Sequence, residues 1–174
     1  MTWCDPSAVM IGVALGARVV AVDVSTPALA LASELGAEAL VDVRSGDPAA
    51  AVREVTGGGA QVSMDALGSA ATAEASVRSL RRRGRHLQVG LLLGADASTR
   101  LPMDLVIPHE LELYGSHGIA GQEYPALLTL IESGALQPGR LIGEVIGLDG
   151  VPAALMAMDR PATTAGITVA KLSQ

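Results

Sequence analysis

Short apolar runs alternate with helical stretches from residue 7 to residue 91, and glycines mark most of the joins. The run at 18–24 (RVVAVDV) is almost continuously apolar, which is typical of a strand buried on both faces of a parallel sheet. Thr26-Pro27 and Asp47-Pro48 each combine an N-cap residue with a proline at the first helical position, so each predicts a helix start. This alternation, with short connections, predicts a doubly wound α/β domain with a parallel sheet and right-handed crossovers.

The pattern also predicts the residue ranges of the individual helices and strands. Helices are expected at 7–15, 26–35, 47–56 and 70–80, and strands at 18–24, 38–43, 61–66 and 86–91. After Gly94 the pattern changes, and residues 110–114 (ELELY) alternate charge with leucine as an edge strand with one solvated face does. A helix at 124–132, the segment 141–148, a helix at 151–158 and the segment 168–172 complete the predicted order.

Composition narrows the class of protein. The chain has 174 residues, 49% of them hydrophobic, which suffices for one domain that buries roughly 70% of its unfolded surface. No uninterrupted apolar run reaches the roughly 18 residues needed to span a bilayer, and residues 1–6 lack the pattern of a secretory signal. We therefore expect a cytoplasmic protein without a membrane partner. Cys4 is the one cysteine, which excludes an internal disulfide and a multi-cysteine metal site.

The charge balance argues against nucleic-acid binding. The formal net charge is -6, whereas phosphate contacts need clustered cations. The one basic run, Arg81-Arg82-Arg83 with Arg85, follows the helix predicted at 70–80. We expect these arginines to interact with the C-terminal end of that helix dipole.

Asp23 is the most informative candidate for chemistry, because it ends an apolar strand that follows a glycine-terminated helix. In a dinucleotide-binding βαβ unit, an acid at the end of the second strand accepts hydrogen bonds from the adenosine ribose and disfavours the 2′-phosphate of NADP. The alternative interpretation is an aspartate that only starts a turn, with Ser25-Thr26 beside it.

The glycine motif that should precede Asp23 is missing. A G-x-G-x-x-G loop about 20 residues before the acid would fall at or before residues 1–6, which contain no glycine. Trp3 would block the approach of a pyrophosphate and Asp5 would repel it. We therefore expect the phosphate cradle and the first, central strand to be absent, leaving a gap in the sheet.

Several stretches, in their order and spacing, resemble the coenzyme-binding C-terminal half of a zinc-dependent medium-chain alcohol dehydrogenase. They are 17–23 (ARVVAVD), 35–38 (LGAE), 64–68 (MDALG), 84–91 (GRHLQVGL), 109–116 (HELELYGS) and 124–134. The resemblance implies a Rossmann-type sheet, truncated before the glycine motif and lacking the usual first strand. It also implies a dinucleotide-binding domain at 1–116 and a segment at 117–174 that in the family packs on the catalytic domain.

The resemblance further implies how NAD would lie. Asp23 would bind the adenosine ribose, and Leu67 and Gly68 would border the adenine. The nicotinamide end would be lined by Val89, Gly90, Leu91 and Ser116. For Leu67, Val89 and Leu91, plain core packing is the alternative.

Zinc and catalysis are not expected from this chain alone. Catalytic zinc needs three protein ligands, whereas Cys4, His86, His109 and His117 show no pairing at i, i+3 or i+4. The first hypothesis is therefore an NAD-binding domain of an oxidoreductase, with no metal ligand and no catalytic residue of its own.

Two alternatives stay open. One is a non-catalytic module that self-associates, or docks on a full-length relative, through the edge strand near 110–116; a clean monomer in light scattering would contradict it. The other keeps dehydrogenase activity, with the catalytic domain supplied in trans by another chain.

Overall fold

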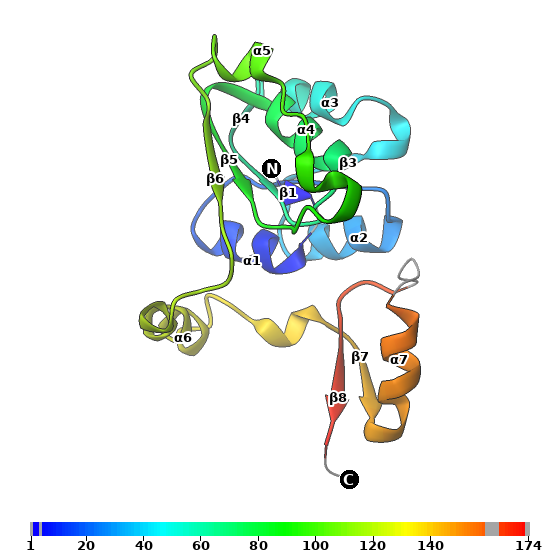
Figure 1. The fold of residues 1–174 in the computed structure, drawn as a ribbon. Helices are drawn as coiled ribbons and strands as arrows, with labels where there is room; N and C mark the ends of the chain where they lie inside the picture. Colours follow the sequence, from blue (N-terminus) through cyan, green and yellow to red (C-terminus); the bar gives the residue numbers. More distant parts are fainter. Residues whose placement is uncertain (1, 4, 159–163, 173–174) are drawn as a thin grey trace.

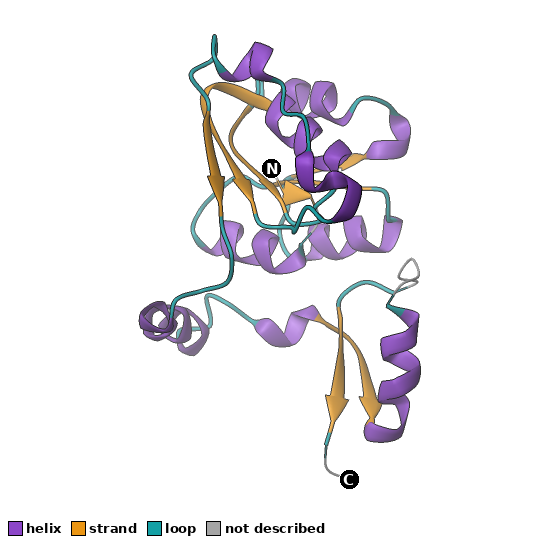
Figure 2. Ribbon diagram, in the orientation of Figure 1, coloured by secondary structure: helices purple, strands orange, loops and turns teal. Residues whose placement is uncertain are grey.

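The main body of this chain is a six-stranded parallel sheet with helices on both faces (Figures 1 and 2). The computed structural model describes residues 2–3, 5–158 and 164–172. The strand order is β3-β2-β1-β4-β5-β6, which is the order of the Rossmann fold. The strands are β1 (Thr2–Trp3), β2 (Val20–Asp23), β3 (Ala39–Asp42), β4 (Ala60–Asp65), β5 (Leu80–Gln88) and β6 (Glu112–Gly115). The fold class predicted from the sequence is confirmed.

The expected loss of the first strand is wrong. β1 lies between β2 and β4, where Thr2 is in register with Ala21 and Met64, and Trp3 with Val22 and Asp65. Even this short pairing gives backbone partners to the carboxyl-terminal parts of both neighbours, which a buried sheet requires. The central position is therefore filled where the sheet borders its ligand-binding edge.

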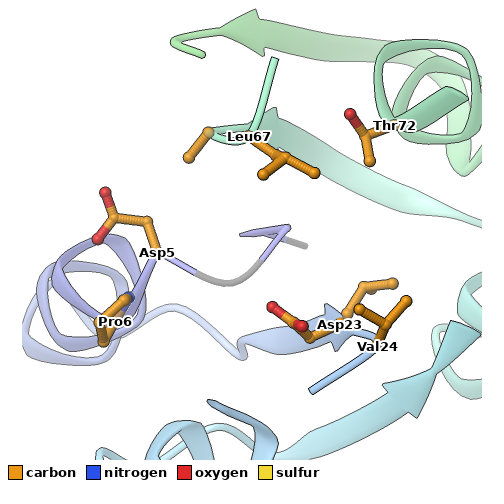
Figure 3. A pocket seen from close by; sticks show the side chains of 8 residues that line it. Asp5, Pro6, Asp23, Val24, Leu67 and Thr72 are labelled. Atoms are coloured by element: carbon orange, nitrogen blue, oxygen red, sulfur yellow. The ribbon is translucent and has the colours of Figure 1, made fainter. Parts of the chain in front are cut away.

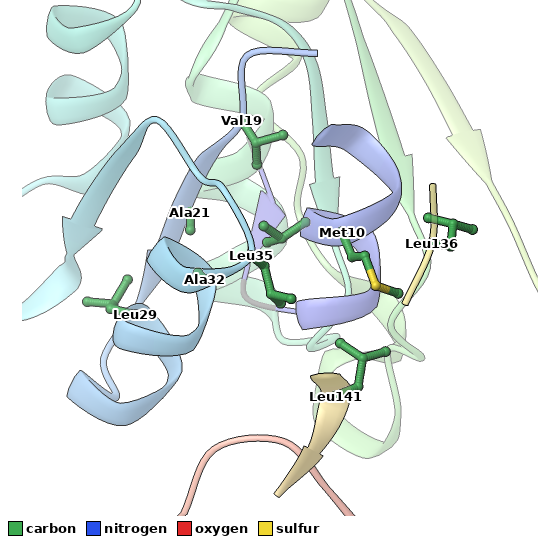
Figure 4. Close-up of a cluster of buried hydrophobic side chains, with 9 residues drawn as sticks. Met10, Val19, Ala21, Leu29, Ala32, Leu35, Leu136 and Leu141 are labelled. Atoms are coloured by element: carbon green, nitrogen blue, oxygen red, sulfur yellow. The ribbon is translucent and has the colours of Figure 1, made fainter. Parts of the chain in front are cut away.

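Two layers of helices bury opposite faces of β2. Ala21 packs with α1 (Pro6–Ala14) and α2 (Thr26–Glu34), whereas Val20 and Val22 pack toward α3 (Pro48–Val55) and α4 (Ala70–Arg78). Successive strand residues point to opposite faces, so a strand covered on both sides must be apolar throughout. Figure 4 shows the first cluster, in which Leu136 and Leu141 from the C-terminal part cover the α1–α2 layer.

The predicted helix starts are confirmed to within one residue, although the cap of α2 is Ser25 and not the expected Thr26. Three of the helices start with one pattern. Asp5, Ser25 and Asp47 each cap a helix with a side-chain oxygen, and each helix has a proline in its first turn. A side-chain oxygen satisfies one of the amide groups that a helix leaves unpaired at its N-terminus. The cap from Asp5 matters most, because it lies at the edge where Rossmann folds bind anions.

The basic run lies on a strand rather than at the end of a helix. α4 ends at Arg78 with Ser79 as its C-cap, and Leu80 already pairs with Ala60 of β4. The register between β4 and β5 then shifts before Val62 pairs with Arg85, so residues 81–83 lie beside the irregular part of the ladder. The arginines thus follow the C-cap of α4 by two residues or more, and their interaction with the end of the helix dipole stays a prediction.

The remaining elements extend beyond the main sheet. β6 ends the strand order and its four residues are exposed; self-association through it stays a prediction. α5 (Met103–Val106) precedes β6, and α6 (Tyr124–Glu132), β7 (Ile142–Gly147), α7 (Val151–Ala157) and β8 (Ile167–Lys171) follow it. β7 and β8 form a separate parallel pair. Within the described ranges, no helix is long and apolar enough to cross a membrane.

Candidate functional site

A cavity of about 370 Å³ opens at the carboxyl ends of β2 and β4 (Figure 3). It is lined by Asp5, Pro6, Val22, Asp23, Val24, Ala66, Leu67 and Thr72. Its size lies at the lower end of the roughly 300–1,000 Å³ of small-molecule sites. Open α/β sheets bind ligands at this edge, where the strand order reverses. We refer to this cavity as the cleft.

Asp23 ends β2 and borders the cleft. Its Oδ1 accepts a hydrogen bond from the Ser25 backbone N–H at 2.7 Å, and Ser25 in turn caps α2. Oδ2 has no hydrogen-bond partner among the described residues. One oxygen therefore holds the turn while the other is free for a ligand, so the two interpretations of Asp23 are compatible.

Asp5 places a second carboxylate at the cleft. Its Oδ1 accepts from the Ser7 backbone N–H at 2.7 Å, and Pro6 has no N–H to offer. The N-terminus of α1, which would otherwise attract a pyrophosphate, thus carries an anion of its own. No basic side chain stands among the described residues that line the cleft. The residues present fit a neutral nucleoside and do not fit the pyrophosphate of NAD.

Asp65 ties together the two loops that follow β4 and β5. This fully buried carboxylate accepts hydrogen bonds from the backbone N–H groups of Leu67 (3.0 Å) and Gly68 (3.1 Å) and from Gln88 Nε2 (2.8 Å). Its carbonyl oxygen accepts from Val89 N and Gly90 N, both at 2.9 Å. Sequence reasoning missed Asp65; the signal was an acid at the end of an apolar strand, followed closely by glycine.

Two predicted site residues, Gly68 and Gly90, cross in close backbone contact. A Cβ added at Gly68 would lie 2.3 Å from the Leu91 carbonyl oxygen, and one added at Gly90 would lie 2.3 Å from Gly68 N. Gly68 also has φ +83, in the left-handed region. The crossing therefore admits only glycine at both positions.

The other predicted residues lie around this crossing. Leu67 and Leu91 are 70% and 59% exposed, which contradicts core packing for both, and Val89 is half-buried. Ser116 follows β6, and its backbone N–H donates to the Gln88 carbonyl oxygen at 2.9 Å. Asp23 and Leu67 share the cleft, whereas Val89, Leu91 and Ser116 are not among its lining.

His86 belongs to a buried polar network rather than to a metal site. It is 2% exposed. Its Nε2 lies 3.1 Å from the Gln88 amide oxygen, so Nε2 carries the proton, and Nδ1 accepts from the hydroxyls of Ser76 (3.1 Å) and Ser63 (3.3 Å). Burial lowers the pKa of His86, opposed by its hydrogen bond to Gln88 and by the charge of Asp65. The ring is held neutral.

We expect the chain to lose stability as the pH falls below about 6.5, the ordinary pKa of histidine. Because the folded pKa of His86 is lowered, the unfolded chain binds a proton first, so the free energy of unfolding is complete above that pH and declines below it. The slope for one proton is at most about 1.4 kcal/mol per pH unit. Urea unfolding at pH 7.5 and 5.5 measures it. His86→Gln should reduce the decline, and an equal decline in this variant would contradict the assignment.

Metal ligands are not gathered in the described part of the chain. It contains no group of three or more His, Cys, Asp and Glu side chains that could hold a metal ion. Cys4 and the side chain of Trp3, two of the residues considered from the sequence, lie outside what the structure describes.

Comparison with known proteins gives consistent matches. Residues 7–133 match the family described as zinc-binding dehydrogenase. The chain is 33% identical over 131 residues to D-arabitol-phosphate dehydrogenase of Enterococcus avium, covering 74% of this chain and 37% of that enzyme. It is 31% identical over 124 residues to an NAD-dependent alcohol dehydrogenase of Sulfurisphaera tokodaii, covering 71% and 35%. The chain thus spans about a third of the length of these curated relatives.

Solved structures extend the likeness to nearly the whole chain. The benzyl alcohol dehydrogenase of Acinetobacter calcoaceticus superposes with a TM-score of 0.84 at 24% identity, covering 98% of this chain and 49% of that one, which bears on the fold alone. The alcohol dehydrogenase of Aeropyrum pernix superposes with a TM-score of 0.75 at 35% identity, covering 88% and 43%.

Proposed function

This chain belongs to the zinc-binding dehydrogenase family, and we propose that it is the NAD-binding domain of an alcohol dehydrogenase, with no catalytic step of its own. The observation that carries the proposal is the free carboxylate oxygen of Asp23 at the cleft. A carboxylate there accepts hydrogen bonds from the ribose hydroxyls and repels a 2′-phosphate, which favours NAD over NADP. The proposal does not extend to the substrates that the names of the relatives mention.

The adenosine end of NAD fits the cleft better than the pyrophosphate. Leu67 offers an exposed apolar side chain beside Asp23, suited to one face of an adenine ring. The loop at Val89–Leu91 and Ser116 would border the nicotinamide end, because both follow strands at the same edge of the sheet. The carboxylate of Asp5 also lines the cleft and would repel the pyrophosphate, so we expect NAD to bind weakly.

Replacing Asp23 with Ala should weaken adenosine binding by about tenfold or more. A hydrogen bond to a charged group contributes about 1.5–3 kcal/mol, and the variant loses the acceptor. Amide chemical shifts in ¹H–¹⁵N spectra, followed during an adenosine titration, measure the dissociation constant even at millimolar values.

Asp42→Ala is the matched control. Asp42 is in register with Asp23 at the end of the neighbouring strand β3, it also accepts a backbone N–H two residues on, and it does not line the cleft. This control should bind adenosine as the unmodified chain does. Equal weakening in both variants, or no adenosine binding by the folded chain, would overturn the proposed function.

A further inference from the structure

A second hollow, of about 560 Å³, lies at the opposite end of the sheet, where β4 and β5 begin. α3, α4 and α5 surround this end (Figure 1). Arg53, Arg78, Arg81 and Arg82 line the hollow together with Asp47 and His109. We propose that this hollow binds a small anion that carries phosphate groups. The proposal is independent of the cleft and of NAD.

The charges in the hollow are poorly neutralised. Arg78 pairs with Glu74 at 2.8 Å and Asp104 at 3.9 Å. In the part of the chain that the structure describes, Arg53, Arg81 and Arg82 have no carboxylate within 4 Å. Asp47 is the single acid in the lining, and its Oδ1 accepts from the Ala49 backbone N–H as a helix cap.

This concentration of cations is exceptional for the chain, whose net charge is -6. Guanidinium groups that share one hollow repel one another, and an anion between them turns that repulsion into attraction. The hollow is therefore a local positive site on an acidic protein, which is the pattern that steers an anionic ligand.

The backbone around the hollow is held in an unusual conformation. Arg83 and Glu110 are the non-glycine residues with positive φ in the described chain, at +58 and +52. They are joined by an ion pair at 2.9 Å, and Arg83 N donates to the His109 carbonyl oxygen at 2.8 Å. Such conformations cost about 1–3 kcal/mol each and gather at functional sites. Here they hold β5 and the segment before β6 together, next to Arg82 and His109 of the hollow.

Two further side chains at the hollow, Arg53 and His109, have hydrogen bonding that bears on ligand binding. Arg53 Nη1 donates to the Arg78 carbonyl oxygen at 2.5 Å, which anchors its guanidinium between α3 and the end of α4. His109 Nδ1 is buried and has no hydrogen-bond partner among the residues that the structure describes. A buried nitrogen without a partner costs free energy, so a ligand group that reached it would lower that cost.

The chemistry favours phosphate over other anions. The planar fork of a guanidinium matches two oxygens of a phosphate, and several arginines around one hollow can hold two phosphate groups at once. The hollow is a small site, open to solvent, on an acidic chain, which suits a small phosphate ester or diphosphate and not a nucleic acid. Inorganic pyrophosphate is the simplest probe of this class.

Titration calorimetry of the full chain with pyrophosphate tests the proposal. We expect saturable binding that weakens about tenfold or more in the double variant Arg81→Ser/Arg82→Ser. The control, Arg18→Ser/Arg44→Ser, removes the same charge from two exposed arginines outside the hollow, each paired with an acid. This control should weaken pyrophosphate binding by less than about threefold, the loss expected from net charge alone.

Two more variants separate a loss of pyrophosphate binding from a loss of the fold and from binding at the cleft. Arg81→Lys/Arg82→Lys keeps both charges and removes the forks, so it should retain the fold and still bind less tightly than the unmodified chain. Asp23→Ala should leave pyrophosphate binding unchanged, which separates this site from the cleft. Non-saturable binding, or equal weakening in the two serine double variants, would overturn the proposal even if adenosine binds at the cleft.

Discussion

Replacing Asp5 with Asn should raise the affinity of the chain for NAD by about tenfold or more. Two unit charges about 5 Å apart interact by roughly 3 kcal/mol at an effective dielectric constant of about 20, and solvent at the open cleft reduces this figure. Asparagine keeps the shape and can still cap α1, so the variant removes the charge with little change in structure. Calorimetry or an NMR titration with NAD measures the change.

The chain contains a close match for this variant. Asp47 caps α3 as Asp5 caps α1, with its Oδ1 on the N–H two residues on and a proline between, but it does not line the cleft. Asp47 lines the arginine hollow and not the cleft, so Asp47→Asn should leave NAD binding at the cleft, followed through the amide shifts of the cleft residues, unchanged. Adenosine carries no phosphate, so its affinity should change by less than about threefold in either variant. A rise in NAD affinity that is equal in both variants would mean that net charge, and not the position of Asp5, limits binding.

Replacing Gly68 with Ala should lower the free energy of unfolding by about 4 kcal/mol, a large share of the total for a domain of this size. The new Cβ would lie 2.3 Å from the Leu91 carbonyl oxygen and 2.7 Å from the Gly90 carbonyl carbon. These are backbone atoms, so relief requires that the loops after β4 and β5 separate. That separation also breaks the hydrogen bonds that both loops make to Asp65.

Gly16→Ala isolates the cost of the backbone conformation. Gly16 has φ +79, close to the +83 of Gly68, and a Cβ there would meet nothing within 4 Å. Its loss should be about 1 kcal/mol, the ordinary cost of alanine in the left-handed region. Urea unfolding followed by circular dichroism gives both values. Similar losses in the two variants would show that the loop crossing opens easily.

The sequence predicted what local pattern and burial determine. The strand at Val20–Asp23 could be predicted because both of its faces are buried and apolar. The helix starts near Thr26 and Asp47 could be predicted because a cap residue and a proline are adjacent in the chain, although the cap of α2 proved to be Ser25. β1 was not foreseen, because its two residues are held by pairing with strands on either side rather than by any pattern of their own.

The parts of the site that the sequence missed depend on contacts between distant segments. Asp65 contacts Gln88 on the neighbouring strand, 23 residues further on, and α4 ends at Arg78, shortly before Leu80 pairs with Ala60. Neither the contact between Asp65 and Gln88 nor the end of α4 is indicated by the residues adjacent to it in the sequence. The placement of Arg81 and Arg82 on β5 follows from the end of α4 at Arg78, so the hollow that they line could not be inferred from their spacing.

The hydrogen bonds of Asp65 join two loops that are distant in the sequence into one structural unit. Residues 65–68 and 88–91 share that carboxylate and its carbonyl, and their glycines fit only each other. Anyone who transplants one of these loops from a relative, to change what the cleft accepts, would have to transplant the other with it. We therefore expect the two segments to change as a pair among relatives, although Gly68 and Gly90 lie more than twenty positions apart in the sequence.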